Sequence, residues 1–174
     1  MSLASGQTTQ PTALLVLDFT NYIVANYSAD PSVVDRAATT IAAARSAGLQ
    51  VIHVVPEPMI DDIHPAVVPV GAEPVLAKTT IGAFATTNLH AILQADQINQ
   101  IVVTGVATSG TVLSTARWAF DVGYNVVVCS DACSDQPAAH AALIDPAVHA
   151  DSWLGLWRIA TVVPAAEIHV LGAH

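Results

Sequence analysis

Hydrophobic and polar positions along the chain follow two alternating patterns. Short runs rich in Val, Ile and Leu give way to segments in which small apolar residues recur every three or four positions. The first pattern is typical of buried strands, and the second of helices that pack on one face. Their alternation predicts βαβ units, and therefore one α/β domain with a largely parallel sheet. The apolar runs lie at 13–17, 51–55, 74–77, 101–104, 126–129 and 159–163, the last expected at the sheet edge.

The helical patterns fall between these runs. Asp30 and Pro31 suit the cap and first turn of a helix over 32–47, and Gly48 suits its end. Further helices are expected at 89–93, 109–123 and 137–143. The segment 56–74 contains five prolines and little periodicity, so it is read as a long excursion. Excursions of that length in compact domains usually carry function or cover a site.

Composition narrows the class of protein. The chain has 174 residues, of which 53% are hydrophobic and 11% charged. No apolar stretch reaches the roughly 18 residues of a membrane span, so no membrane partner is expected. The net charge of −9 argues against nucleic acid, which requires clustered Lys and Arg. A surface so poor in charge favours a homo-oligomer, a dimer or tetramer.

The N-terminal sequence and the cysteines predict where the domain begins and in which cellular compartment the protein lies. Residues 1–11 lack the basic and apolar regions of a signal peptide and are expected to be a disordered leader to a domain over 12–174. Cys129 and Cys133 stand alone, without a second pair, so neither a zinc site nor a disulfide framework is indicated. A reducing cytoplasm fits these cysteines.

Candidate chemistry follows from the rule that ligands bind beyond the carboxyl ends of parallel strands. Asp18 directly follows the first strand, and Lys78, the single lysine of the chain, follows the run 74–77. A carboxylate beside Lys78 would keep the lysine charged and the carboxylate ionised. The alternatives are that Asp18 caps a loop and that Lys78 is a solvated surface residue. Asp131, after the run 126–129, is also a candidate.

The turn 105–111 lies between a strand and a helix and directs backbone N–H groups at one spot, which suits an anion or an oxyanion. It is neither a dinucleotide fingerprint nor a P-loop, because the required glycine spacing and lysine are missing. The histidines form no site by spacing, and Asp61, Asp62 and His64 are better read as a solvated loop than as metal ligands.

Several blocks in the same order resemble the isochorismatase-like hydrolases, a superfamily of isochorismatases, nicotinamidases and small-amide hydrolases. The resemblance covers nearly the whole chain after the leader. The blocks that carry it are Leu14–Asp18 with Asn21, Lys78–Phe84, Asn88–Leu89, Val102–Thr108, Leu113–Arg117, Gly123–Tyr124 and Ser130–Cys133.

The resemblance implies a three-layer, doubly wound fold around a six-stranded parallel sheet in Rossmann-like order. It implies Asp18 as general acid or base with Lys78 as its charged partner. It also implies a cis peptide between Val106 and Ala107, next to amides that form an oxyanion hole. Nicotinamidases hold a metal with an aspartate and two histidines after the second strand; 54–57 offers no such set, so neither metal nor cofactor is expected.

Substrate contacts are expected from Phe19 and Phe84, which flank the two charged residues in sequence, and from Val106 and Ala107. Core packing is the alternative for both phenylalanines. The expected substrate is a small anionic molecule, because the N–H groups of the turn attract anions.

One position departs from the family pattern. Most members place a nucleophilic cysteine where this chain has Thr111, and a threonine hydroxyl is a weak nucleophile without a strong adjacent base. Three hypotheses remain. The chain is a hydrolase that uses Asp18 and Lys78 without a covalent intermediate, as true isochorismatases do on a vinyl ether. Alternatively, Thr111 attacks an amide or ester, or the chain binds a ligand without turnover.

Overall fold

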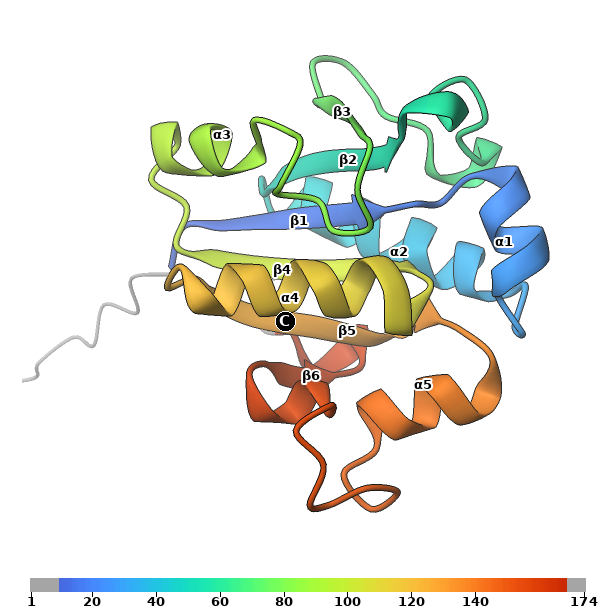
Figure 1. The fold of residues 1–174 in the computed structure, drawn as a ribbon. Coiled ribbons are helices and arrows are strands. Elements are labelled where there is room, and N and C mark those ends of the chain that lie inside the picture. Colours follow the sequence, from blue (N-terminus) through green and yellow to red (C-terminus); the bar gives the residue numbers. More distant parts are fainter. Residues whose placement is uncertain (1–9, 169–174) are drawn as a thin grey trace, which may run out of the picture.

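Six parallel strands form one sheet in the order β3-β2-β1-β4-β5-β6 (Figure 1). The computed structural model describes residues 10–168. This strand order, with β1 and β4 adjacent at the centre, confirms the doubly wound prediction. The strands are β1 Thr12–Leu17, β2 Gln50–Pro56, β3 Val75–Lys78, β4 Gln100–Val106, β5 Asn125–Ser134 and β6 Thr161–Val163.

Helices cover both faces of the sheet and make the outer two of three layers (Figure 1). Successive residues of a strand point to opposite faces, so Leu14 and Val16 pack with one set of helices and Leu15 and Leu17 with the other. The first core includes residues of α1 (Asn21–Tyr27) and α2 (Val33–Ser46). The opposite core includes residues of α3 (Leu89–Ala95), α4 (Leu113–Asp121) and α5 (Pro137–Ile144).

The predicted strands and helices are found close to their expected positions, with three differences. Helix α1 was not predicted; its N-cap is Thr20, whose side chain accepts a hydrogen bond from the amide of Ile23. The helix expected from 109 begins as a wide π-helical turn over Thr108–Val112. Strand β5 continues to Ser134, because its pairing with β4 shifts register between Val103 and Gly105.

That longer strand corrects the expectation for Asp131. The residue lies within β5 and not beyond its carboxyl end, and its carboxylate accepts hydrogen bonds from the Cys129 thiol and the Ala165 amide. Asp131 therefore helps to hold the C-terminal segment against β5. Within 10–168, no helix is both long and apolar enough to cross a bilayer.

Two features of the fold shape the region beyond Asp18. A Cβ atom on Gly105 would lie 2.8 Å from Leu17 Cβ, so glycine allows β4 to approach β1 here. The excursion 57–74, with 3₁₀ turns at Glu57–Met59 and Pro65–Val67, lies against the segment after β1. The amide of His64 donates to the Phe19 carbonyl, and that of Asn21 to the Asp62 carbonyl, both at 2.9 Å.

Candidate active site

Asp18 lies just past the carboxyl end of β1, at the centre of the sheet. Its backbone is left-handed, with φ of 58°, a conformation that aspartate tolerates better than most residues. Strained backbone of this kind clusters at functional sites. The side chain is buried, and its Oδ1 atom has no hydrogen-bond partner in the described structure. A buried carboxyl oxygen without a partner is rare in native proteins, and a catalytic role is one explanation for it.

Lys78, the last residue of β3, reaches across to Asp18 although β2 separates their strands. Its Nζ donates to Asp18 Oδ2 and to Thr111 Oγ1, both at 2.8 Å, and to the carbonyl of Ile81. The residue is 2% exposed. An ammonium has three donors, so these contacts occupy all of them. The carboxylate partner expected for Lys78 is thus Asp18.

Burial controls the ionisation of this pair. It raises the pKa of Asp18 to about 6, although Lys78 and, less strongly, Thr111 act to lower it. The pKa of Lys78 is lowered, because the loss of water outweighs the attraction of Asp18. The expectation that Lys78 simply keeps Asp18 ionised is therefore incomplete: desolvation leaves a carboxyl that takes up a proton near neutral pH.

The turn between β4 and α4 forms the opposite wall of the site. The peptide between Val106 and Ala107 is cis, and the wide turn that follows brings Thr111 beside Lys78. Turns of this π type are frequent at functional sites. The Thr111 hydroxyl accepts its hydrogen bond from the ammonium of Lys78.

A pocket of ≈ 860 Å³ opens over these groups. Its residues come from the ends of β1, β3 and β4 and from α1, which gives it a mainly apolar wall around one ion pair. Among the described lining residues, Lys78 is the single cation. The lining residues are Asp18, Ile23, Tyr27, Pro56, Lys78, Thr79, Thr80, Ile81, Val106, Ala107, Gly110 and Thr111.

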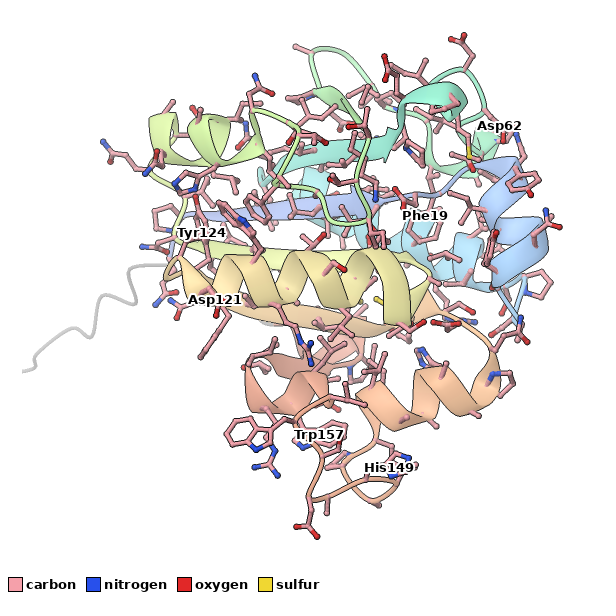
Figure 2. All side chains as sticks on the ribbon, in the orientation of Figure 1. Phe19, Asp62, Asp121, Tyr124, His149 and Trp157 are labelled. Atoms are coloured by element: carbon pink, nitrogen blue, oxygen red, sulfur yellow. The ribbon has the colours of Figure 1, made fainter. Side chains whose placement is uncertain are left out.

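Two predicted contact residues lie elsewhere. Phe19 is 1% exposed and packs in the core on the α1 and α2 side of the sheet, where Figure 2 shows it between the end of β1 and α1. Phe84 is buried on the other side and stacks on Trp118, with ring centroids 4.3 Å apart. Neither lines the pocket, so the structure favours the core-packing alternative for both. Proximity in sequence to Asp18 and Lys78 did not indicate which way each ring points.

Tyr27 and Ile81 are pocket residues that the sequence reasoning missed. Tyr27 comes from α1, the helix that the pattern did not reveal, and Ile81 is 66% exposed in the loop after β3. The Ile81 carbonyl is also a partner of Lys78. A signal for Ile81 was its place at the start of an apolar run, 81–84, which begins three residues after the single lysine.

The other reactive side chains lie away from this pocket. Burial raises the pKa of Cys129 to about 12 and that of Cys133 well above its usual range, so both thiols stay protonated. His53, inside β2, contacts Glu73, which also binds Arg45. In residues 10–168, no group of three or more His, Cys, Asp or Glu side chains is arranged to hold a metal ion.

Comparison with known proteins agrees with this architecture. The sequence model of the isochorismatase domain matches residues 12–153. The chain belongs to the isochorismatase family. Two solved structures of the family are similar over nearly their whole length. A putative isochorismatase hydrolase from Oleispira antarctica has a TM-score of 0.80 and 28% identity, over 96% of this chain and 100% of the other. An isochorismatase family protein from Burkholderia thailandensis has a TM-score of 0.77 and 30% identity, over 92% and 95%.

A curated relative is named for a hydrolase activity. The streptothricin hydrolase of Streptomyces noursei is 35% identical over 142 residues, which are 73% of this chain and 51% of that protein. The chain therefore spans about half the length of that relative.

Proposed function

We propose that the chain is a hydrolase that uses Asp18 as a general acid, held by Lys78, without a covalent intermediate. The observation that carries the proposal is the buried Asp18 carboxyl, which has one oxygen on Lys78, the other unpartnered, and a pKa raised to about 6. A carboxyl with a pKa near the working pH is suited to give and take back a proton.

We rank a vinyl ether first as the substrate. Its hydrolysis uses one proton, which Asp18 donates and later receives back. Asp18 donates its proton to the methylene carbon, and the adjacent C–O unit becomes an oxocarbenium ion. Water adds to the oxocarbenium carbon and gives up a proton to Asp18, which leaves a hemiketal. The hemiketal then collapses: its hydroxyl proton ends on the departing ether oxygen, and an alcohol and a ketone are released. Lys78 stabilises the Asp18 carboxylate while the proton is on the substrate. Ala107 and Thr111 line the same pocket, and in this proposal their backbone amides donate to the oxygen of the departing alcohol as the ether bond breaks.

The pocket also bears on the predicted anionic substrate. Lys78 uses its donors on Asp18, Thr111 and Ile81, so the described lining offers an anion no free positive charge. Ile23 and Tyr27 are among the residues of this mainly apolar lining. We infer that an anionic group of the substrate is bound by backbone amides of the turn or lies toward solvent, and is not paired with a side-chain cation.

A second candidate is an amide or ester hydrolase with Thr111 as nucleophile. Its support is the position of Thr111 in the pocket beside Lys78 and the turn, where the family pattern has cysteine. Against it, the hydroxyl accepts a hydrogen bond from a charged ammonium, which lowers the electron density available for attack. The non-catalytic hypothesis predicts ligand binding without conversion.

The pH dependence of turnover tests the acid role. The pKa of Asp18 is about 6, so the protonated form dominates below that pH and falls about tenfold per pH unit above it. The kcat/KM of an isochorismatase-type reaction is therefore expected to be highest near pH 5 and to decline from pH 6 to 8. A profile that rises across this range would assign Asp18 as a base and contradict the proposed step.

A further inference from the structure

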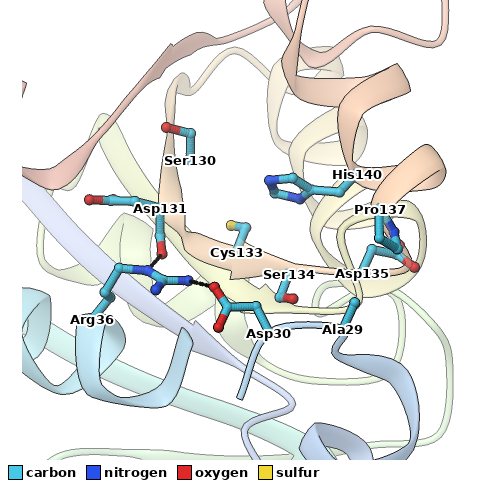
Figure 3. Close-up of a pocket in the computed structure, with 10 residues that line it drawn as sticks. All are labelled: Ala29, Asp30, Arg36, Ser130, Asp131, Cys133, Ser134, Asp135, Pro137 and His140. Carbon is cyan, nitrogen blue, oxygen red and sulfur yellow. Dashed lines mark hydrogen bonds and ion pairs between the residues drawn. The ribbon is translucent and has the colours of Figure 1, made fainter. Parts of the chain in front are cut away.

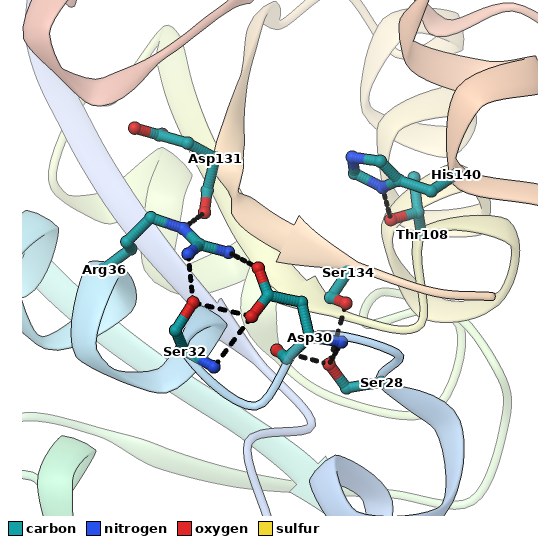
Figure 4. A network of polar contacts seen from close by, with 8 residues as sticks. All are labelled: Ser28, Asp30, Ser32, Arg36, Thr108, Asp131, Ser134 and His140. Atoms are coloured by element: carbon teal, nitrogen blue, oxygen red, sulfur yellow. Dashed lines mark hydrogen bonds and ion pairs between the residues drawn. The ribbon is translucent and has the colours of Figure 1, made fainter. Parts of the chain in front are cut away.

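The segment 135–140, which leads from the end of β5 through the first turn of α5, contacts the turn 106–112 outside the candidate active site. Asp135 Oδ2 accepts a hydrogen bond from the Ser109 amide at 2.7 Å. The Thr108 hydroxyl and His140 Nδ1 form a hydrogen bond of 2.9 Å, and Figure 4 marks this contact with a dashed line. Thr108 is fully buried and Asp135 is 8% exposed, so solvent does not replace either contact readily.

These contacts lie outside the pocket that holds Asp18. Asp135 and His140 line a second pocket of ≈ 380 Å³ that shares no lining residue with the first, and Figure 3 shows both residues around it. Arg36, at the other side of this second pocket, is already bound to Asp30 and to the Asp131 carbonyl. Asp135 and His140 therefore reach the active-site turn without touching the site itself.

The turn needs partners of this kind. Amides in the first turn of a helix have no acceptor within the helix, and a carboxylate is the strongest acceptor that a side chain can offer them. The turn also carries Ala107, Gly110 and Thr111 into the active-site pocket, so its placement sets the distance between these groups and Asp18. A displacement of about 1 Å in such groups can cost on the order of 10²-fold in rate.

We propose that Asp135 and His140 are positioning residues, which fix the turn 106–112 at the geometry that catalysis requires. Only the expected effect on kcat rests on the hydrolase function proposed above. The restraint of the turn itself does not depend on that function. Asp135 holds the backbone at Ser109, and His140 holds the side chain at Thr108. Two separate contacts from one segment restrain the turn against rotation as well as displacement.

Hydrogen–deuterium exchange of the full chain tests the restraint without a substrate. In Asp135→Ala, the amides of 106–112 are expected to exchange at least several-fold faster. Asp135→Asn keeps an acceptor oxygen for Ser109 but loses the contact of Oδ1 with the Gln136 amide, so its exchange is expected to be closer to that of the wild type than to that of Asp135→Ala. Asp145→Ala is the matched control: it removes a carboxylate that accepts from the Ala147 amide at the opposite end of α5, away from the turn. His140→Ala and His140→Asn repeat the comparison for Thr108, so the result does not depend on one variant folding.

Kinetic measurements then distinguish a role in positioning the turn for catalysis from a purely structural role. With a substrate that the enzyme converts, Asp135→Ala is expected to lower kcat about 10- to 100-fold with little change in KM. Asp135→Asn is expected to keep most of the wild-type kcat. Unchanged exchange in both alanine variants would overturn the proposal, as would faster exchange with an unchanged kcat. Faster exchange in a protein that turns over nothing would uphold the restraint and contradict the hydrolase function instead.

Discussion

Lys78→Met is expected to lower the free energy of unfolding by about 3–5 kcal/mol at pH 8, because it leaves the buried Asp18 carboxylate without its cation. Such a loss is a large part of the stability of a typical domain. Chemical denaturation in urea, followed by circular dichroism, measures it.

The pH dependence of this loss identifies its cause. A carboxyl whose folded pKa is raised contributes most stability below its unfolded pKa, near 3.8, and the contribution is lost as pH rises through the folded pKa, about 6. Without Lys78 the folded pKa rises further, so the penalty is expected to shrink at pH 5, where Asp18 is protonated. Asp18→Asn combined with Lys78→Met should recover much of the stability at pH 8. An equal loss at pH 5 and pH 8 would show that packing, and not charge, is responsible.

Thr111→Cys is expected to create a reactive thiol in a protein that otherwise has none. The new sulfur would lie beside the Lys78 ammonium and at the pocket, and a neighbouring cation lowers the pKa of a thiol. The native thiols Cys129 and Cys133 are buried, and burial raises the pKa of each. Iodoacetamide at pH 7 should therefore add once to the variant and not to the folded wild type, as measured by mass spectrometry.

Thr115→Cys is the matched control for this experiment. It places a thiol one helical turn further along α4, where Thr115 is fully buried and outside the pocket. This variant should label no faster than the wild type. Equal labelling of the two variants would contradict the claim that the pocket and Lys78 activate position 111.

The sequence predicted the fold and the meeting of Asp18 with Lys78 because both follow from strand order. The carboxyl ends of parallel strands lie at one edge of the sheet, so residues at the carboxyl ends of β1 and β3 can meet once the sheet is known to be doubly wound. The resemblance to the isochorismatase-like hydrolases supplied that order. The single lysine also stood out because no other lysine competes with it.

Other features depend on three-dimensional packing that has no local signal. Helix α1 has seven residues, too few for a clear periodic stripe, so Tyr27 was not expected at the pocket. The register shift that extends β5 past Asp131 arises from its pairing with β4. The direction of the Phe19 and Phe84 rings depends on the cores that receive them. The raised pKa of Asp18 likewise reflects burial by distant segments.

Turnover of a substrate panel by the wild type and by Asp18→Asn and Thr111→Val tests the central claim most directly. The panel holds isochorismate as the vinyl ether, with aryl esters and small amides for the alternative. The account predicts conversion of a vinyl ether and a loss of about 10²- to 10⁴-fold in Asp18→Asn, far larger than the loss in Thr111→Val. Full activity in a folded Asp18→Asn would contradict it, as would a wild type that converts no member of the panel.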